Sequence, residues 1–244
     1  MIQVLGRAFD VIETLSCCPN RPMALGEIAS AVSLHPATCA RILHSLVERG
    51  YAEQVGRRKG YLLGPMAHAV AASGPYRRDL TFAAEPELQR LAACTGDTCL
   101  LAVLIGRRRY TIARAHGGED VQVSADLVLM ESPFRTATGR LLLSALSPIH
   151  LDRVLEDVTF PLDDWPEVRS ADVAREFLHA IRGRDLLICE DRSFAALASP
   201  VLQRGDTVAS VGLYLPSERF SGTHRQLVTR GVRDCAARIS STLR

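Results

Sequence analysis

Polar side chains recur at helical spacing in the segment that follows Pro36. They are Thr38, Arg41, His44 and Ser45, with His35 and Ala37 at the start of the expected helix. Residues three or four positions apart lie on one face of an α-helix, so these groups are expected to point the same way. Guanidinium and hydroxyl groups bind DNA base edges and phosphates, and the free N–H groups at a helix start attract phosphate. This helix face is therefore a candidate for contact with DNA.

A second basic group, Arg57, Arg58 and Lys59, lies between Gly56 and Gly60. Glycines at both ends of a short polar loop are typical of a hairpin turn. Three cations at the tip of such a turn suit a phosphate backbone or a minor groove. A basic surface loop is more often only solvated, so this interpretation depends on the helix that precedes the loop.

The surrounding elements predict a winged helix-turn-helix over residues 1–64. Apolar spacing indicates a first helix whose buried stripe is Leu5, Ala8, Phe9, Ile12 and Leu15. A short helix at about 25–31 follows, and then the helix from Pro36, which Gly50 ends. The buried face of that helix is expected to consist of Cys39, Leu43, Leu46 and Val47. Strands at 51–55 and 61–64 complete the module. Its seven Lys/Arg against five Asp/Glu make it mildly basic.

The rest of the chain predicts a linker helix at 65–82 and a larger α+β domain at 83–244. We expect Pro86 to open the first helix of that domain. Apolar runs then predict strands at 99–105, 109–115, 121–129, 186–189, 196–202 and 207–215. Helices are expected at 139–146, from Pro148, at 171–181 and at 223–243, where Leu227 belongs to the buried stripe. This pattern favours an antiparallel sheet with packing helices.

Composition narrows the class of protein. The chain has 244 residues, of which 47% are hydrophobic and 23% charged, as in an ordinary globular protein. No apolar run reaches 18 residues and the N-terminus lacks a signal-peptide core, so we expect a cytoplasmic protein. The seven cysteines are odd in number and have no C-x-x-C spacing, which argues against a disulfide framework or a zinc site. No cofactor or metal ion is expected.

Catalytic motifs are absent from the sequence. It holds no G-x-G-x-x-G, Walker A, G-x-S-x-G or H-E-x-x-H pattern. A nucleophilic Cys99 or Cys189 stays open, although neither has a histidine beside it in sequence. Asp163 and Asp164 are adjacent carboxylates, but Trp165 beside them indicates a surface loop. An enzyme with a DNA-tethering domain and a ligand-independent scaffold are the alternatives to a regulator.

Several stretches resemble motifs of the IclR family of transcriptional regulators. They are 7–13, 25–29, 37–43 and 60–64 in the first module and 132–140 and 195–201 in the second. The resemblance implies an α+β fold: an N-terminal winged helix-turn-helix, a linker helix used in dimerisation, and a C-terminal GAF-like α/β effector-binding domain. The chain departs from the family's pattern because no glycine lies between Gly183 and Gly205, and because Arg135 and Arg140 replace histidine and lysine.

The resemblance also implies where a small carboxylic acid would bind. Relatives hold such acids in a cleft of the second domain, at a helix start and two strands. The matching positions here are Ala137, Thr138, Gly139, Glu190, Phe194, Ala196, Gly212 and Tyr214. We expect Gly212 to enlarge the cavity and Tyr214 to offer a phenol. Phe194 and Tyr214 would suit an aromatic acid, unless they only pack in the core.

The sequence thus predicts a DNA-binding transcriptional regulator that responds to a small organic acid. The expected partners are a pseudo-palindromic DNA operator, the acid, and further copies of the chain in a homodimer or a dimer of dimers. No membrane partner is expected. The alternative is a small-molecule-processing enzyme that carries a DNA-tethering winged-helix domain.

Overall fold

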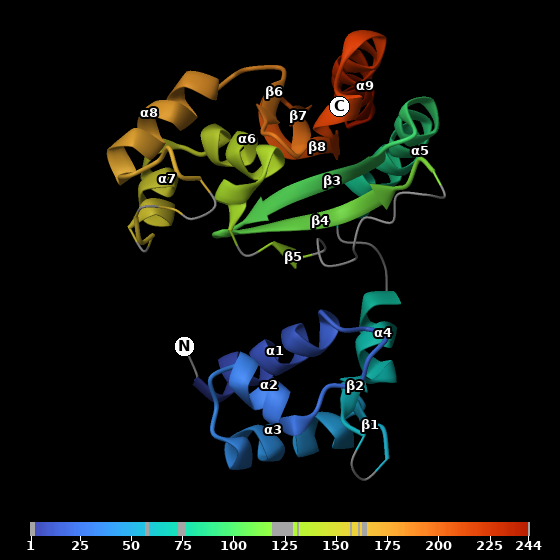
Figure 1. Cartoon of the computed structure of the whole chain (residues 1–244), viewed down its shortest axis with the longest axis vertical. Helices are drawn as coiled ribbons and strands as arrows, with labels where there is room; N and C mark the ends of the chain where they lie inside the picture. The colour runs from blue at the N-terminus through green and yellow to red at the C-terminus, as the bar shows by residue number, and fades with distance from the viewer. Residues whose placement is uncertain are drawn as a thin grey trace. The chain divides into compact units, whose positions relative to one another are not determined.

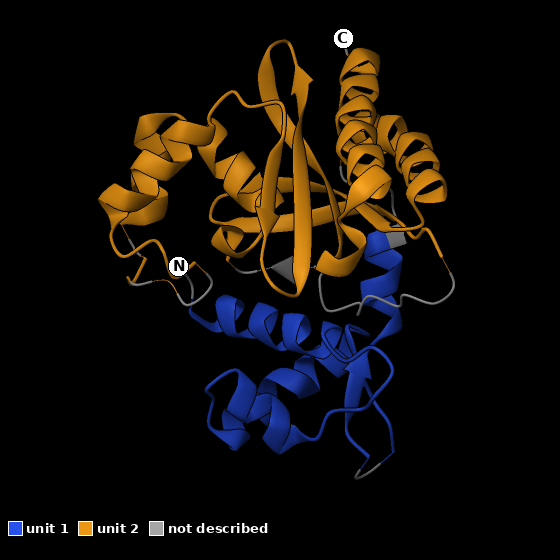
Figure 2. Cartoon of the chain, turned by 45° about the horizontal axis from the view of Figure 1, so that its top comes forward, with its two compact units in different colours: residues 1–75 blue, residues 76–244 orange. Residues whose placement is uncertain are grey.

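The computed structural model describes residues 3–56, 59–72, 77–118, 129–130, 132–156, 158–160, 162 and 165–243. The chain divides into two compact units, residues 1–75 and 76–244 (Figure 2). Each unit has its own hydrophobic core. The expected linker, 65–82, is therefore divided between the two units.

The first unit is a winged helix-turn-helix. Its elements are α1 (Gln3–Ser16), α2 (Leu25–Ala31), α3 (Pro36–Glu48), β1 (Ala52–Gln54), β2 (Tyr61–Leu63) and α4 (Pro65–Ala72) (Figure 1). Pro36 occupies the first turn of α3, where its missing N–H costs nothing. Gly50 follows the end of α3 with φ of 74°, a left-handed conformation that glycine adopts readily. Both ends of α3 lie where the sequence predicts them.

The core of the first unit differs from the prediction at α1. Val11 and Leu15, one turn apart, are the buried residues of this helix. Leu5 and Phe9, which were expected inside, are 52% and 59% exposed. The prediction was wrong for these two because α1 packs on α2 and α3 along one narrow side, and its apolar stripe is wider than that contact.

The second unit is built on a six-stranded antiparallel sheet in the order β5-β4-β3-β8-β7-β6. The strands are β3 (Thr98–Ile105), β4 (Arg108–Ala115), β5 (Leu129–Met130), β6 (Leu187–Glu190), β7 (Phe194–Gln203) and β8 (Asp206–Pro216). Helices α5 (Arg78–Thr95) and α9 (Gly222–Thr242) cover one face. Helix α6 (Ala137–Ala145) covers the other, with α7 (Pro148–Leu155) and α8 (Ala171–Ile181) packed beyond it (Figure 1).

Alternation along the strands separates the two faces of this sheet. Cys99, Leu101 and Val103 of β3 pack with the core of α5 and α9. Leu100 and Ala102 point to the opposite side, where they contact Leu142 of α6. Successive strand residues point to opposite faces, so each strand contributes to two different environments. The fold class that the sequence predicts is confirmed.

Three local predictions fail in the second unit, and a fourth lies almost wholly outside the described residues. Helix α5 begins at Arg78, so Pro86 lies inside it and does not open it. The carbonyl that Pro86 leaves without a donor belongs to Phe82, whose side of the helix is open to solvent. Trp165 is buried and not at the surface, whereas Leu227 is 44% exposed. Of the strand expected at 121–129, the structure describes only Leu129, together with Met130 in β5.

Candidate functional site

Helix α3 is amphipathic, as the sequence predicts. Cys39, Leu43 and Leu46 are buried, and Val47 is partly buried against the same core. On the other side Arg41, His44 and Ser45 are exposed, and Thr38 is partly buried. The polar side chains are thus free to meet a DNA groove, while the apolar side anchors the helix.

The two histidines near this face have local partners. His35 is the N-cap of α3, and its Nδ1 accepts a hydrogen bond from the Ala37 N–H at 3.3 Å. The amide expected to bind phosphate is therefore already occupied, and Nε2 of His35 carries the proton in the neutral ring. His44 Nε2 lies 3.4 Å from the Glu48 carboxylate. That carboxylate opposes an approaching phosphate, so Arg41 is the strongest cation of the face.

The wing is fixed at its base by the segment before α2. Met23 and Tyr61 exchange two backbone hydrogen bonds of 2.9 and 2.8 Å. A Cβ on Gly60 would overlap the Met23 backbone, so this close approach requires glycine. Lys59 is exposed at the turn. Arg57 and Arg58 lie outside the described residues.

The start of α6, in the second unit, is tightly packed. Ala137, Thr138 and Gly139 are all buried. Thr136 caps the helix by accepting the Gly139 N–H at 3.1 Å, and a Cβ on Gly139 would overlap the Pro133 carbonyl. Of the three amides expected to hold a carboxylate, that of Gly139 is therefore occupied.

The structure overturns the expectation that Gly212 opens a cavity. A Cβ at Gly212 would lie 2.6 Å from Cγ2 of Thr138 and 3.1 Å from Cδ1 of Leu100. The space that the missing side chain leaves is filled by Thr138. Gly212 therefore allows α6 to approach β8 closely, and Thr138 is held 4% exposed between helix and sheet.

A β-bulge in β4 aligns two arginines that the sequence analysis missed. Leu101 and Ala102 are adjacent in β3, but their partners in β4 are Ala113 and Thr111, so Ile112 is an extra residue. The bulge reverses the alternation beyond it. Arg109 pairs with Leu104 and Arg114 with Leu100, both on the α6 face. Strict alternation would have separated Arg109 from Arg114, five positions away, so no local signal could have joined them.

Arg109 is a buried cation in this arrangement. It is 2% exposed, and its Nε donates to Thr138 Oγ1 at 2.7 Å. Burial, reinforced by the positive charge of Arg114, lowers the pKa of Arg109 to about 10. At neutral pH the guanidinium therefore stays protonated in surroundings that disfavour its charge.

Arg114 and Tyr214 complete this polar group. Nη2 of Arg114 is buried without a hydrogen-bond partner among the described residues. Burial raises the pKa of the Tyr214 phenol, and the nearby charges of Arg114 and Arg109 oppose that rise. Tyr214 pairs with Thr98 and Ala196, on the same face as Gly212. We name Arg109, Arg114, Thr138 and Tyr214 the arginine site.

The structure separates Glu190 and Phe194 from the arginine site. Glu190 follows Cys189, whose side chain packs on the α6 side, so Glu190 points to the other face. There it lies 3.8 Å from Arg225 of α9. Phe194 is on the α6 side but at the first position of β7, where it is 54% exposed. Ala196, two positions along, packs with the core beside α6.

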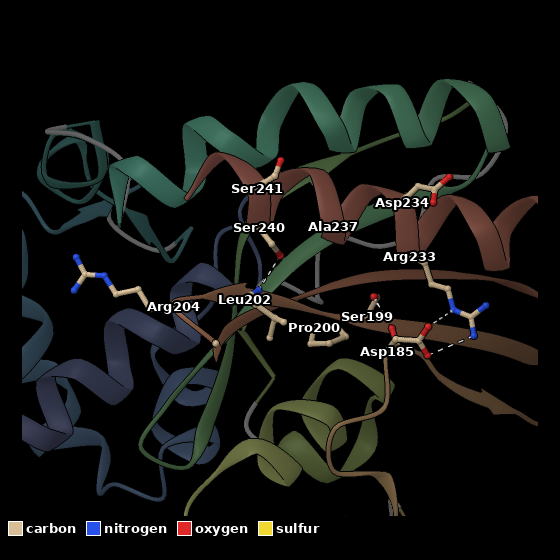
Figure 3. A pocket seen from close by; sticks show the side chains of 11 residues that line it. Asp185, Ser199, Pro200, Leu202, Arg204, Arg233, Asp234, Ala237, Ser240 and Ser241 are labelled. Atoms are coloured by element: carbon tan, nitrogen blue, oxygen red, sulfur yellow. Dashed lines mark hydrogen bonds and ion pairs between the residues drawn. The ribbon is translucent and has the colours of Figure 1, made fainter. Parts of the chain in front are cut away.

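A pocket of about 600 Å³ lies elsewhere in the second unit, where the β7–β8 hairpin meets α9 (Figure 3). Its charged lining is largely paired: Arg233 contacts Asp185 at 2.9 Å. Ser240 accepts the Leu202 N–H at 2.8 Å, so this hydroxyl is also occupied. None of the residues expected to bind an effector lines this pocket.

The surroundings of Cys99 and Cys189 do not favour a nucleophile. Burial raises the pKa of both Cys99 and Cys189, which reduces the thiolate fraction. Among the described residues, no three His, Cys, Asp or Glu side chains gather closely enough to hold a metal ion. None of the described helices has the length and apolar character needed to cross a membrane.

The fold and the exposed face of α3 define the class first: a two-domain DNA-binding protein with a winged helix-turn-helix. The chain belongs to the IclR family of bacterial transcriptional regulators. Residues 4–56 match the model of the IclR helix-turn-helix domain, and residues 76–241 match that of the C-terminal part of the bacterial transcriptional regulator IclR. The family that the sequence motifs indicated is confirmed.

Individual relatives are similar to this chain in sequence over nearly its whole length. The transcriptional regulator BhcR of Paracoccus denitrificans is 26% identical over 98% of this chain and 86% of its own length. The glycerol operon regulatory protein of Streptomyces griseus is 29% identical, over 99% and 96%. Both are regulators by name, and this chain is a DNA-binding transcriptional regulator.

Solved structures share the fold. An IclR transcriptional regulator from Alicyclobacillus acidocaldarius superimposes with a TM-score of 0.79 at 21% identity, over the whole of both chains. An IclR homolog from Microbacterium hydrocarbonoxydans, in complex with 4-hydroxybenzoate, gives a TM-score of 0.75 at 18% identity, over 98% of each chain.

Proposed function

We propose that this regulator binds its operator through α3 and the wing, and that a small organic acid at the arginine site changes that binding. The observation that carries the proposal is the buried Arg109 beside the partly buried Arg114, whose Nη2 is buried; neither has a carboxylate partner among the described residues. Buried charges are normally paired, so an anion is the missing component. The 4-hydroxybenzoate held by a protein of the same fold is a carboxylic acid, which supports this class of ligand.

Binding of the acid would join β4, β8 and α6, the three elements that supply the arginine site. An effector changes DNA affinity only by the difference in its affinity for the two states of the protein, typically 1–3 kcal/mol. We therefore expect the acid to shift operator affinity by about 5- to 150-fold at saturation.

The regulator is proposed to act as a homodimer or a dimer of dimers on a pseudo-palindromic operator. Large apolar side chains are exposed in the first unit: Val4, Leu5 and Phe9 on α1 and Met66 and Val70 on α4. Exposed apolar groups of this size often mark protein contacts. Two recognition helices in a dimer would contact half-sites about one or more DNA turns apart.

The DNA assignment is tested by fluorescence anisotropy on an operator selected from random duplexes with the full chain. Arg41→Ala should weaken specific binding by about 10-fold or more, because a bidentate base contact contributes about 1–3 kcal/mol. Arg49→Ala is the control, because Arg49 is exposed at the C-cap of the same helix and its substitution removes the same charge. An equal loss of operator affinity in the two variants would mean that Arg41 contributes only its positive charge and no specific base contact.

The acid response is tested on the same complex. Titration with carboxylic acids should change the anisotropy of the operator complex, and Arg109→Met should abolish the change while leaving operator affinity without acid intact. An operator complex that responds to no acid would refute the proposed effector function.

A further inference from the structure

We infer that the pocket between the β7–β8 hairpin and α9, here named the hairpin pocket, is a second ligand site, and that its ligand is a small organic amine with an apolar body. This site is separate from the arginine site, so the inference goes beyond the proposed function. The hairpin pocket would take a positively charged ligand, whereas the arginine site would take an anion.

The walls of the hairpin pocket are held in place by hydrogen bonds from the hairpin. Leu202 donates its N–H to Ser240 Oγ of α9 at 2.8 Å. Gln203 donates from Nε2 to the Leu243 carbonyl at 3.1 Å, and its Oε1 accepts from Arg77 at 3.2 Å. The hairpin is therefore fixed against α9 and the start of α5, so the pocket is formed before a ligand arrives. Its volume of about 600 Å³ lies within the range of small-molecule sites.

The serine hydroxyls of the lining present hydrogen-bond acceptors to the pocket. A hydroxyl has one hydrogen to donate, and each of these groups donates it to a backbone carbonyl. The residues are Ser199, Ser240 and Ser241, with distances of 2.7, 2.6 and 2.7 Å. The hydroxyl lone pairs that stay open therefore accept hydrogen bonds from a ligand and cannot donate to it.

The edge of β7 beside the pocket offers acceptors as well. In the described sheet, β6 pairs only with residues 195–198 of β7, so the strand beyond them has an open edge. Pro200 has no N–H, and the N–H of Leu202 is already bonded to α9. Ser199 directs its carbonyl toward β8, where it accepts from Ser210, so alternation directs the Pro200 carbonyl outward. A ligand at this edge therefore meets a carbonyl oxygen and must supply the donor.

Asp234 is the carboxylate that can hold a ligand ammonium. It lines the pocket and lies 3.5 Å from Arg230, whose side chain is 86% exposed. An ion pair this exposed contributes little, so an ammonium can replace Arg230 at little cost. The other carboxylate, Asp185, is held by Arg233 through contacts of 2.9 and 3.5 Å. Arg204 lies at the far end of the pocket, away from both carboxylates (Figure 3).

Apolar side chains separate the two ends of the pocket. Pro200, Leu202 and Ala237 line it, and Leu202 is 40% exposed (Figure 3). A carbon chain or an aromatic ring on these side chains would remove apolar surface from water. Acceptors beside an apolar surface favour an ammonium group on an apolar body. A carboxylate in the same position would face groups that also only accept.

The experiment compares amines with alcohols of the same carbon frame, on the full chain, by isothermal titration calorimetry. The pairs are hexylamine with hexan-1-ol and 2-phenylethylamine with 2-phenylethanol. We expect the better amine to bind at least about 10-fold more tightly than its alcohol, because hydrogen bonds to charged groups are the stronger ones. Asp234→Asn should remove this preference. Glu176→Gln, which removes the same charge from an exposed side chain of α8, should not. Equal affinity for amine and alcohol would overturn the inference.

Two measurements locate the bound amine. In methyl NMR spectra of the full chain, the amine should shift the signals of Ala237 and Leu202. Ala237→Trp fills the pocket and should abolish binding, whereas Ala180→Trp, at an exposed alanine of α8, should keep it. Amine binding that survives Ala237→Trp would place the ligand elsewhere and overturn the inference.

The remaining outcomes separate this site from other uses of the same surface. A change of oligomeric state in Ala237→Trp, measured by sedimentation velocity, would show that the pocket is an interface between copies of the chain and would overturn the inference. Arg109→Met should leave amine binding unchanged, and a loss there would assign the amine to the arginine site. Absence of binding by both amines would overturn the inference and leave the acid response of the proposed function intact.

Discussion

The two faces of the six-stranded sheet handle charge differently. On the side of α5 and α9, arginines meet carboxylates. The pairs are Arg219–Asp97 at 2.7 Å, Arg225–Glu190 at 3.8 Å, Arg233–Asp185 at 2.9 Å and Arg238–Glu87 at 2.6 Å. On the α6 side, Arg109 and Arg114 have no such partner in the described parts of the chain. The first face uses charge to hold helices in place, and the second leaves positive charge that the acid of the proposed function would balance.

The difference has an energetic basis. A charge that is paired within the fold has its desolvation repaid there, but it is no longer available to an incoming group. An unpaired buried charge destabilises the free protein, and it increases the affinity of the protein for an anion. A binding site can therefore be recognised as a place where the fold leaves polar groups unsatisfied.

The largest expected effect tests the paired face. The carboxylate of Asp97 is 2% exposed and contacts Arg219 at 2.7 Å and His224 at 2.9 Å. Asp97→Ala should reduce the free energy of unfolding by about 2 kcal/mol, below the 3–5 kcal/mol of a fully buried pair because both partners reach solvent. Urea denaturation measures this. A loss below 0.5 kcal/mol, on the order of an exposed pair, would contradict a stabilising role for this face.

A smaller effect tests the packing of the arginine site. Gly212→Ala places a methyl group against Cγ2 of Thr138 and should cost about 1–2 kcal/mol of stability. Thr138→Ser removes that methyl and keeps the hydroxyl that accepts from Arg109. The double variant should therefore recover most of the loss, as a thermal-melt double-mutant cycle would measure. Additive losses would mean that the two residues do not touch.

The smallest effect separates Glu190 from the arginine site. Its contact with Arg225 is long at 3.8 Å, and both side chains are more than one third exposed. Glu190→Gln should change stability by less than about 0.5 kcal/mol and leave acid binding unchanged. Calorimetric titration with a binding acid measures the second quantity. An altered affinity would place Glu190 within the site and weaken the contrast between the faces.

Local sequence signals were sufficient for α3 of the first unit. Helix α3 begins at Pro36 and ends before Gly50 because each residue has a backbone requirement of its own. Cys39, Leu43 and Leu46 follow the helical repeat, so their burial and the exposure of Arg41 are determined together. The expected burial of Phe9 failed because amphipathic spacing does not say how wide the contact with neighbouring helices will be.

The sequence by itself determined the α+β class, the winged helix-turn-helix, the family and most of the strands, since these depend on periodicity, glycine and proline. The tertiary structure alone decided the arginine site. The extra residue Ile112 in β4 places Arg114 beside Arg109, and the close approach of α6 places Thr138 in the space at Gly212. Strand register and interhelix distance depend on residues far apart in the chain, and no local pattern encodes them.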